Sequence, residues 1–377
     1  MRIVIVTDNL SFSRGGSECY LLSLITRLIA NSHDVHVFHY RGSDQVEGGK
    51  YYQVRVLPYP RFLREWSFCR RVDRRASSLS ADAILTVRPL SSATHYRLSN
   101  GVHRRCFEAE RETFPAGWRR TMYRTGLLLN PKQQLLMRAQ RRLLTRANRP
   151  RLLTNSNLSR CHLEEEYGVA PSDALVLYSG VDLDLFQPGI VRGLARSAGG
   201  ESPQLLFVGH HFALKGLRCL LEALAGASSA SFDLNLRVVG AGPISQFKNL
   251  AARLGLSSRV EFLGGVSRAE MPELYRASTA LVHPTFYDPC SLATLEAMAC
   301  GCPVITTRRN GAAELIESGR NGWVIDHPRD LEALAHAVVE VSRPGVSQDA
   351  GRAAAVTARQ RLDLNEHVAA VTKWLES

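Results

Sequence analysis

The stretch from Ala280 to Thr306 constrains the fold of this chain most, because strand-type and helix-type patterns follow one another within it. An apolar run, Ala280 to Val282, ends in His283-Pro284 and is typical of the end of a buried strand. The apolar residues after the next polar turn recur at helical spacing: Leu292, Leu295 and Ala299. Gly301 and Pro303 predict the end of this helix, and residues 303–306 predict a second strand.

This strand–loop–helix–strand pattern indicates a parallel α/β sheet. The sequence predicts that the helix begins at Asp288-Pro289 or one turn later at Ser291. Ligands of such sheets bind beyond the carboxyl ends of the strands. The open amides and the positive dipole end of the helix suit a phosphate or a diphosphate there.

Two carboxylates bracket the turn. Seven residues separate Asp288 from Glu296, which places Asp288 in the loop and Glu296 about two turns into the helix. A carboxylate beside a diphosphate is costly unless it binds hydroxyl groups, so we expect one acid to bind a sugar and the other a ribose. The alternative is that Asp288 only caps the helix and Glu296 is a solvated helix position.

The stretch resembles the signature of the retaining, nucleotide-sugar-dependent glycosyltransferases of family 4. Their pattern is an acid, seven residues, Glu, and then Ala-x-Ala-x-Gly-x-Pro-Val-Ile. Residues 296–305 read Glu-Ala-Met-Ala-Cys-Gly-Cys-Pro-Val-Ile, and Gly311 and Glu314 fit the downstream part. The first acid is usually Glu and is Asp288 here, so the charge is kept on a shorter side chain.

The resemblance implies an α/β fold of the type called GT-B, with two Rossmann-like domains facing each other across a cleft. A chain of 377 residues with 45% hydrophobic residues is long enough for two cores. We expect an acceptor domain at 1–180, a nucleotide-sugar domain at 181–360 and a C-terminal helix at 361–377 that crosses back to the first domain.

A strand–glycine–helix pattern opens the chain. Residues 1–7 are a buried-type strand, and Gly15-Gly16 and Glu18 precede a helical pattern. Glycine lets a backbone approach a ligand closely, although a glycine pair is also common in tight turns. Family members carry a Gly-Gly pair at the donor diphosphate and the acceptor, so the resemblance implies this role for Gly15 and Gly16, with Glu18 on the acceptor side.

A second strand ends at Gly209, and Lys215-Gly216 opens the next helix. Lysine beside a helix amino terminus suits a diphosphate, although an isolated lysine is more often only solvated. Family members read Phe-Val-Gly-Arg and then Lys-Gly, and His210 stands here in place of the Arg. The resemblance therefore gives Lys215 the main diphosphate charge, with Gly209 and His210 also on the donor side.

The acceptor side is predicted around Asn100 and His103. Lipopolysaccharide-core glucosyltransferases of the family, which add glucose to a heptose, carry an Asp-containing stretch near this point. Asn100 occupies that place here, so His103 is the stronger polar candidate. The alternative for His103 is a structural surface histidine.

The segment 97–151 is strongly basic, with fourteen Arg or Lys and three acids. Three interpretations stay open: a solvated basic helix over a core, attachment to an anionic membrane surface, and nucleic-acid binding. No zinc-finger spacing or aromatic-rich RNA motif supports nucleic acid, so we expect none. A phosphorylated acceptor also fits the charge.

The resemblance implies transfer of a hexose with retention, and we expect a UDP-hexose such as UDP-glucose as donor and a lipid-linked or lipopolysaccharide-core sugar as acceptor. Lys215, Asp288 and His103 are the predicted catalytic residues, and the donor also meets Cys290, Ser291, Leu292 and Glu296. No metal or other cofactor is expected, because Lys215 and the helix dipoles balance the diphosphate. The alternatives are a nucleotide-sugar epimerase of the same fold and a catalytically weak, membrane-bound scaffold.

The remaining sequence features concern location. No apolar run approaches the roughly 20 residues of a membrane span. The start of the chain shows no signal-peptide pattern, and the eight cysteines are scattered without metal-ligand spacing. We therefore expect a cytoplasmic protein with reduced thiols that binds peripherally to the inner face of the cytoplasmic membrane.

Overall fold

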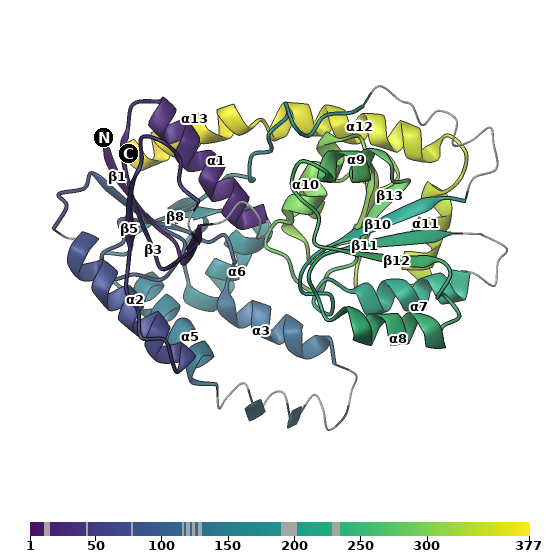
Figure 1. Cartoon of the computed structure of the whole chain (residues 1–377), viewed down its shortest axis with the longest axis horizontal. Helices are drawn as coiled ribbons and strands as arrows, with labels where there is room; N and C mark the ends of the chain where they lie inside the picture. The colour runs from purple at the N-terminus through teal and green to yellow at the C-terminus, as the bar shows by residue number, and fades with distance from the viewer. Residues whose placement is uncertain are drawn as a thin grey trace. The chain divides into compact units, whose positions relative to one another are not determined.

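The computed structural model describes residues 1–10, 16–42, 44–76, 78–114, 117, 121–122, 125–126, 130–189, 202–227 and 234–377. The chain divides into two compact units (Figure 1). Unit 1 comprises residues 1–180 and 365–377, and unit 2 comprises residues 181–364. Gly15 of the predicted glycine pair lies outside the described residues.

Unit 1 is built on a seven-stranded sheet whose strand pairs are all parallel. The strand order across the sheet is β5-β3-β1-β6-β7-β8-β9. In chain order these strands are β1 Arg2–Val6, β3 Asp34–His39, β5 Lys50–Gln53, β6 Ala83–Thr86, β7 His95–Arg97, β8 Arg151–Thr154 and β9 Ala174–Val176. A small separate pair joins β2 Asn9–Leu10 to β4 Arg41–Gly42.

Helices alternate with these strands, as the right-handed crossovers of a parallel sheet require. The described helices of unit 1 are α1 Gly16–Ala30, α2 Arg61–Ala76, α3 His103–Glu112, α5 Pro131–Thr145, α6 Asn157–Tyr167, the short η1 Pro171–Asp173 and α13 Leu364–Glu376. Helix α2 packs Phe68 and Val72 onto the apolar face of β1, β3 and β6. The second core cluster joins β7, β8 and the helices α5 and α6.

Unit 2 repeats the architecture on a six-stranded parallel sheet of order β12-β11-β10-β13-β14-β15. Its strands are β10 Gln204–Val208, β11 Asn235–Val239, β12 Val260–Gly264, β13 Ala280–His283, β14 Val304–Thr307 and β15 Gly322–Ile325. Its helices are α7 Leu217–Ala227, α8 Ile244–Arg253, α9 Met271–Arg276, α10 Leu292–Ala299, η4 Gly311–Leu315, α11 Leu331–Val341 and α12 Val346–Arg361.

Two helix layers enclose the sheet of unit 2. Helices α7, α8 and α11 lie on one face, and α9, α10 and α12 lie on the other (Figure 1). Because both faces are covered, β13 and β14 are buried along their whole length, and their sequences are apolar apart from His283 and two threonines. The predicted fold class, two parallel α/β domains, is confirmed.

The chain enters and leaves unit 2 through two paired segments. The Val181 amide donates to the Leu362 carbonyl at 2.7 Å, and the Leu364 amide donates to the Val181 carbonyl at 3.2 Å. The predicted C-terminal helix is α13, which belongs to unit 1. None of the helices in the described ranges is long and apolar enough to cross a membrane. The seven described cysteines are thiols rather than disulfides.

Candidate active site

The site of unit 2 lies at the carboxyl ends of β10, β13 and β14, where three loops meet. Gly216 follows the first loop with φ of +80°, and a Cβ there would lie 1.9 Å from the Pro284 carbonyl oxygen. Only glycine permits this approach. The Phe286 amide also donates to the Leu214 carbonyl at 2.8 Å. The loop before α7 is thereby held against the loop after β13.

This packing joins Lys215 to Asp288, two of the predicted catalytic residues. Lys215 Nζ donates to Asp288 Oδ2 at 2.6 Å, and both side chains are largely buried. His283, the last residue of β13, places Nε2 3.3 Å from the same carboxylate oxygen. Sequence reasoning missed His283 as a site residue, although a polar side chain at the end of a buried strand was a usable signal.

The charges of this trio are defined by their surroundings. Burial raises the pKa of Asp288, but the charge of Lys215 and the hydrogen bond from His283 outweigh it and bring the pKa well below its usual range. Burial lowers the pKa of His283. The imidazole is therefore neutral, and its Nε2–H donates to the ionised carboxylate, which can only accept.

The amino end of α10 is fixed by Ser291 and Asn310. Ser291 caps the helix, its hydroxyl accepting from the Thr294 amide at 3.3 Å. Asn310 Oδ1 accepts from the Ser291 amide at 3.1 Å, and its Nδ2 donates to two threonine hydroxyls. Of the two predicted helix starts, Ser291 is therefore correct. The role of Asn310 was missed, because its partners come from two other segments.

The other predicted donor amides belong to the same turn. Cys290 is buried just before the cap, and Leu292 is the first residue of α10. The amides of the first helical turn have no carbonyl four residues earlier to accept them. The Ser291 amide is already taken by Asn310, so Leu292 and its successor supply the remaining donors of the turn.

Glu296 lies on α10 with both carboxylate oxygens in hydrogen bonds. Arg268 donates to Oε1 at 3.0 Å, and the Tyr275 hydroxyl donates to Oε2 at 3.2 Å. Burial raises the pKa of Glu296, and the charge of Arg268 opposes the shift. Because α10 begins at Leu292, Glu296 is a little over one turn into the helix, and the predicted two turns were too many.

Two more predicted donor residues lie on the first loop. Gly209 follows β10, and its amide donates to the Val239 carbonyl at 3.0 Å. A Cβ at Gly209 would lie 3.1 Å from the side chain of Lys215. His210 is exposed, and its Nδ1 accepts from the Ala241 amide at 3.4 Å.

The predicted acceptor residues belong to unit 1. Gly16 is the first residue of α1, and Glu18 lies in its first turn. Asn100 is exposed in the loop after β7. His103 begins α3, and its amide donates to Gln140 Oε1 at 3.0 Å. Burial, together with the charges of Arg88 and Lys132, lowers the pKa of His103 to about 4, so its imidazole is neutral.

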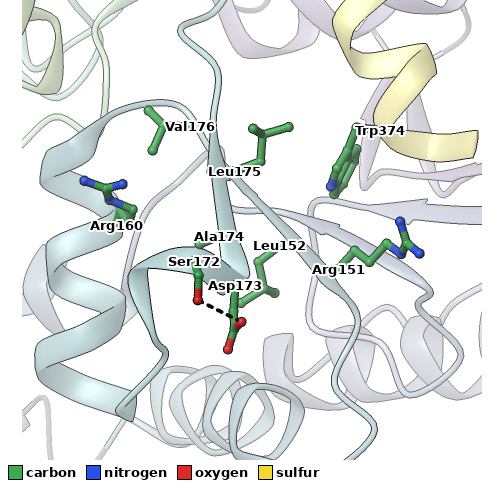
Figure 2. A pocket seen from close by; sticks show the side chains of 9 residues that line it. All are labelled: Arg151, Leu152, Arg160, Ser172, Asp173, Ala174, Leu175, Val176 and Trp374. Atoms are coloured by element: carbon green, nitrogen blue, oxygen red, sulfur yellow. Dashed lines mark hydrogen bonds between the residues drawn. The ribbon is translucent and has the colours of Figure 1, made fainter. Parts of the chain in front are cut away.

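A separate cavity of about 450 Å³ lies in unit 1 beside the edge strand β9 and the C-terminal helix α13 (Figure 2). Arg151, Arg160 and Trp374 are among the nine lining residues. None of the sequence-predicted site residues lines it. Within the described ranges, no group of three or more His, Cys, Asp or Glu side chains could hold a metal ion.

Two family models match the chain. The model described as Glycosyltransferase Family 4 matches residues 14–185, and the model described as Glycosyl transferases group 1 matches residues 202–343. The chain belongs to family 4 of the glycosyltransferases. The first match covers most of unit 1 and the second most of unit 2, and the predicted site residues lie within the matched residues.

Curated members of the family resemble part of the chain. D-inositol 3-phosphate glycosyltransferase 2 of Catenulispora acidiphila is 33% identical over 188 residues, which cover 46% of this chain and 44% of that protein. D-inositol 3-phosphate glycosyltransferase of Arthrobacter sp. is 30% identical over 242 residues, which cover 60% of this chain and 57% of that protein. The chain thus spans about half the length of the curated relatives it matches.

Solved glycosyltransferases share the fold over the whole chain. WaaG, a glycosyltransferase involved in lipopolysaccharide biosynthesis, matches with a TM-score of 0.82 and 22% identity, covering 99% of each chain. Anabaena Alr3699/HepE, solved in complex with UDP and glucose, matches with a TM-score of 0.71 and 20% identity over 100% of this chain and 99% of its own. The fold is GT-B.

Proposed function

We propose that this chain transfers a hexose from a UDP-hexose donor to a hydroxyl group of a sugar-containing acceptor. The observation that carries the proposal is the contact of Lys215 with Asp288 beside the amino ends of α7 and α10. A buried ammonium and two helix amino ends form a positive site at the carboxyl edge of a parallel sheet. Such a site suits the diphosphate of a nucleotide sugar.

Lys215 is the residue proposed to stabilise the leaving group. Its ammonium has three N–H groups, so it can keep Asp288 and also bind a diphosphate oxygen. Charge grows on that oxygen as the bond to the sugar breaks, and a positioned cation stabilises this charge most strongly in the transition state. The amides at the start of α10 add to the same effect.

Asp288 and Glu296 are proposed to bind hydroxyl groups on opposite sides of the diphosphate. Asp288 is ionised, and we assign it to the transferred sugar. Glu296 has lone pairs left beyond its bonds to Arg268 and Tyr275, so it can accept from the ribose diol. In this scheme His103 of unit 1 binds the acceptor, as a neutral hydrogen-bonding group rather than a charged one.

The proposed stereochemistry is retention. Asp288 is held by Lys215 and Glu296 by Arg268, so neither of these two carboxylates is proposed as a nucleophile. The diphosphate oxygen then takes the proton of the acceptor hydroxyl on the face that it leaves. The protein contributes by positioning the two substrates and by stabilising the charge on the diphosphate.

UDP-glucose is the proposed donor, and a lipid-linked or lipopolysaccharide-core sugar is the proposed acceptor. Two likenesses support this choice: HepE was solved with UDP and glucose, and WaaG is involved in lipopolysaccharide biosynthesis. The curated relatives, named for inositol 3-phosphate, support a polyol phosphate as a second acceptor to test.

The exposed face of α2 is the proposed contact with an anionic membrane. Trp66 is 43% exposed and stacks under Arg70, whose guanidinium carbon lies 5.0 Å from the ring centroid. Tyr59 and Leu57, just before the helix, are also exposed, while the helix's acids Glu65 and Asp73 point inward to polar partners. Aromatic rings among arginines suit the headgroup region of an anionic bilayer.

The membrane contact was predicted within residues 97–151, and two arginines of that segment are paired with acids in the structure. Arg104 and Arg105 form ion pairs with Glu165 and Glu166 of α6 and with Glu108 of α3. Part of the segment, including most of residues 115–129, lies outside the described residues.

The test is to incubate the purified chain with UDP-glucose, with and without a heptose-containing core lipid or D-inositol 3-phosphate. UDP release that needs an acceptor, with an α-linked product by NMR, is the expected result. Interconversion of the donor sugar would replace the proposal with an epimerase. If neither reaction occurs while UDP still binds, the result would support the catalytically weak scaffold.

A further inference from the structure

Four residues of unit 2 form a contact group around one carboxylate, here called the Glu296 cluster: Phe186, Arg268, Tyr275 and Glu296. The proposed reaction gives a role only to Glu296. Tyr275 lies on α9 and Glu296 on α10, and these two helices pack together. Arg268 lies in the turn between β12 and α9, and Phe186 lies near the start of unit 2. The cluster is therefore made by tertiary packing within unit 2.

Arg268 projects from a closed turn. The hydroxyl and the amide of Ser267 donate to the Glu270 carboxylate at 2.5 Å and 3.1 Å, and the Glu270 amide donates to the Ser267 carbonyl at 3.2 Å. A Ser and a Glu three residues apart that bond each other in this way fix the chain just before a helix. The turn thus presents Arg268 from a defined position.

The guanidinium of Arg268 is held on two sides. Its Nη1 donates to Glu296 Oε1 at 3.0 Å, and its central carbon lies 4.9 Å from the centroid of the Phe186 ring. A cation over an aromatic face is attracted to the ring, so the second contact helps to orient the side chain. Phe186 is fully buried, and its amide donates to the Asp182 carbonyl at 2.8 Å.

Tyr275 holds the other oxygen of the carboxylate. Its hydroxyl donates to Glu296 Oε2 at 3.2 Å, and its ring lies 6.2 Å from that of Phe186 between centroids. Burial and the charge of Glu296 keep the pKa of the Tyr275 hydroxyl well above its usual range, so the hydroxyl stays a donor. Each carboxylate oxygen of Glu296 therefore has one bond and keeps a lone pair for a ligand.

The charge balance of the cluster depends on Arg268. The side chain of Glu296 is 11% exposed, and that of Arg268 is 26% exposed. Burial raises the pKa of Glu296, while the charge of Arg268 and the hydrogen bonds from Tyr275 and Arg268 lower it. Tyr275 is a neutral donor, so Arg268 supplies the positive charge in this cluster. Arginine keeps that charge at every pH at which proteins are studied.

We propose that Arg268 is a positioning residue for the nucleotide donor. It holds Glu296 ionised and in the orientation in which the free lone pairs of the carboxylate accept from the ribose diol. This rests on the proposed function, in which Glu296 binds the ribose of UDP. Tyr275 alone would orient one oxygen and leave the buried charge without a cation, which is costly.

The probe is UDP, and the readout is its dissociation constant by calorimetry with the full chain at pH 8 and pH 5.5. Arg268→Met should weaken binding by about tenfold at pH 8, the scale of one hydrogen bond to a charged group. The ratio of variant to parent dissociation constants should be larger at pH 5.5. Without its cation Glu296 takes up a proton at a higher pH, and the protonated acid accepts fewer hydrogen bonds.

The ratio removes the titration of UDP itself, because both chains meet the same ligand. The other titratable groups that face the Arg268–Glu296 pair are Tyr275, Cys300 and Cys302. Burial raises the pKa of the Cys300 thiol far above the tested range, and Tyr275 stays protonated. Arg268→Lys keeps a cation and a donor, so it should recover most of the affinity and bring the two ratios together.

A double-mutant cycle tests whether Arg268 acts through Glu296. In the Glu296→Gln background, Arg268→Met should weaken UDP binding less than it does in the parent. The pH dependence of the ratio should also disappear, because an amide does not titrate in this range. Fully additive losses would mean that Arg268 acts without Glu296, and the proposal would be wrong.

The matched control is Arg253→Met, which removes an exposed arginine of α8 and should leave UDP binding unchanged at both pH values. If Arg268→Met does not fold, Arg268→Gln replaces it, because the amide keeps a donor but no charge. Parent-like UDP binding by the variant at both pH values would overturn the role of Arg268 alone. A parent chain that binds no UDP would instead overturn the proposed function, and the ribose role of Glu296 with it.

Discussion

At the residue scale, the site of unit 2 depends on two acids whose ionisation is governed by burial and by the side chains that donate to them. Asp288 stays ionised because Lys215 and His283 both donate to it. Glu296 is buried against Arg268 and Tyr275, and burial raises the pKa of its carboxyl group. The two acids thus share a loop–helix unit but differ in environment, which gives each a separate test.

Lys215→Ala should lower turnover more than it lowers UDP binding. The ammonium matters most when charge develops on the leaving diphosphate, and one such electrostatic donor is worth about 2–4 kcal/mol of transition-state stabilisation. Initial rates and calorimetric titration of UDP measure the two effects. Lys248→Ala, an exposed lysine of α8, is the control. Parent-like activity of Lys215→Ala would exclude it from the mechanism.

Glu296→Ala should weaken UDP binding by about 1.5–3 kcal/mol, the range for hydrogen bonds to a charged group. Glu296→Gln keeps the shape and part of the acceptor capacity, so it should be milder. Asp288→Ala should leave UDP affinity nearly intact and impair use of UDP-glucose. Calorimetric titration of UDP into these variants tests both assignments. If Asp288→Ala weakens UDP binding and Glu296→Ala does not, the roles assigned to the two acids are reversed.

At the element scale, loop packing decides where the site groups lie. The turn before α7 contacts the turn after β13 only because residue 216 is glycine, and Asn310 connects the start of α10 to β14 and η4. Helix α2 shows the same principle in unit 1. It buries Phe68 and Val72, bonds its two acids to inward partners, and leaves Trp66 and Arg70 outside.

The exposed face of α2 should bind anionic vesicles. We expect co-sedimentation with vesicles of equal parts phosphatidylcholine and phosphatidylglycerol to fall as salt rises past about 0.15 M, where the Debye length is about 8 Å. The double substitution Trp66→Ser with Arg70→Gln should weaken vesicle binding relative to the parent chain at the same salt concentration. Val356→Ser, an exposed apolar position of α12, should not. Equal binding to neutral vesicles would argue against this surface.

At the scale of the whole molecule, both units are parallel sheets between helices, and the C-terminal helix α13 completes unit 1. That helix is held by buried histidines. His367 Nε2 lies 2.5 Å from the Tyr20 hydroxyl, and His95 packs edge-on against Trp374 at 4.7 Å between ring centroids. Burial lowers the pKa of His367 to about 3 and that of His95 to about 4.

Acid should therefore destabilise unit 1. Between about pH 6.5 and pH 4 the unfolded chain protonates these histidines while the folded chain does not, so the free energy of unfolding falls as pH falls. Each histidine adds a slope of about 1.4 kcal/mol per pH unit in that window. Calorimetric Tm values at pH 7, 6 and 5 should decline, and less steeply for His367→Gln. If Tm falls equally steeply with pH in the parent and in His367→Gln, His367 does not contribute to the acid destabilisation.

The sequence by itself determined the elements and the family. Periodicity and glycine positions predicted the strand–loop–helix–strand unit around residue 288, since strand and helix patterns are local. That motif identified Asp288 and Glu296 as site candidates, and a second motif at residues 209–216 identified Lys215. Neither motif could show how these side chains pair.

Only the tertiary structure decided which side chains meet. Lys215 and Asp288 are 73 positions apart, and Arg88 and Asp8 are 80 apart, yet each pair is in hydrogen-bond contact. These contacts depend on which strands become neighbours in a sheet and on how loops pack at their ends. The basic segment 97–151 shows the same limit, because charge counted along a chain does not reveal the acids of α6 that fold against it.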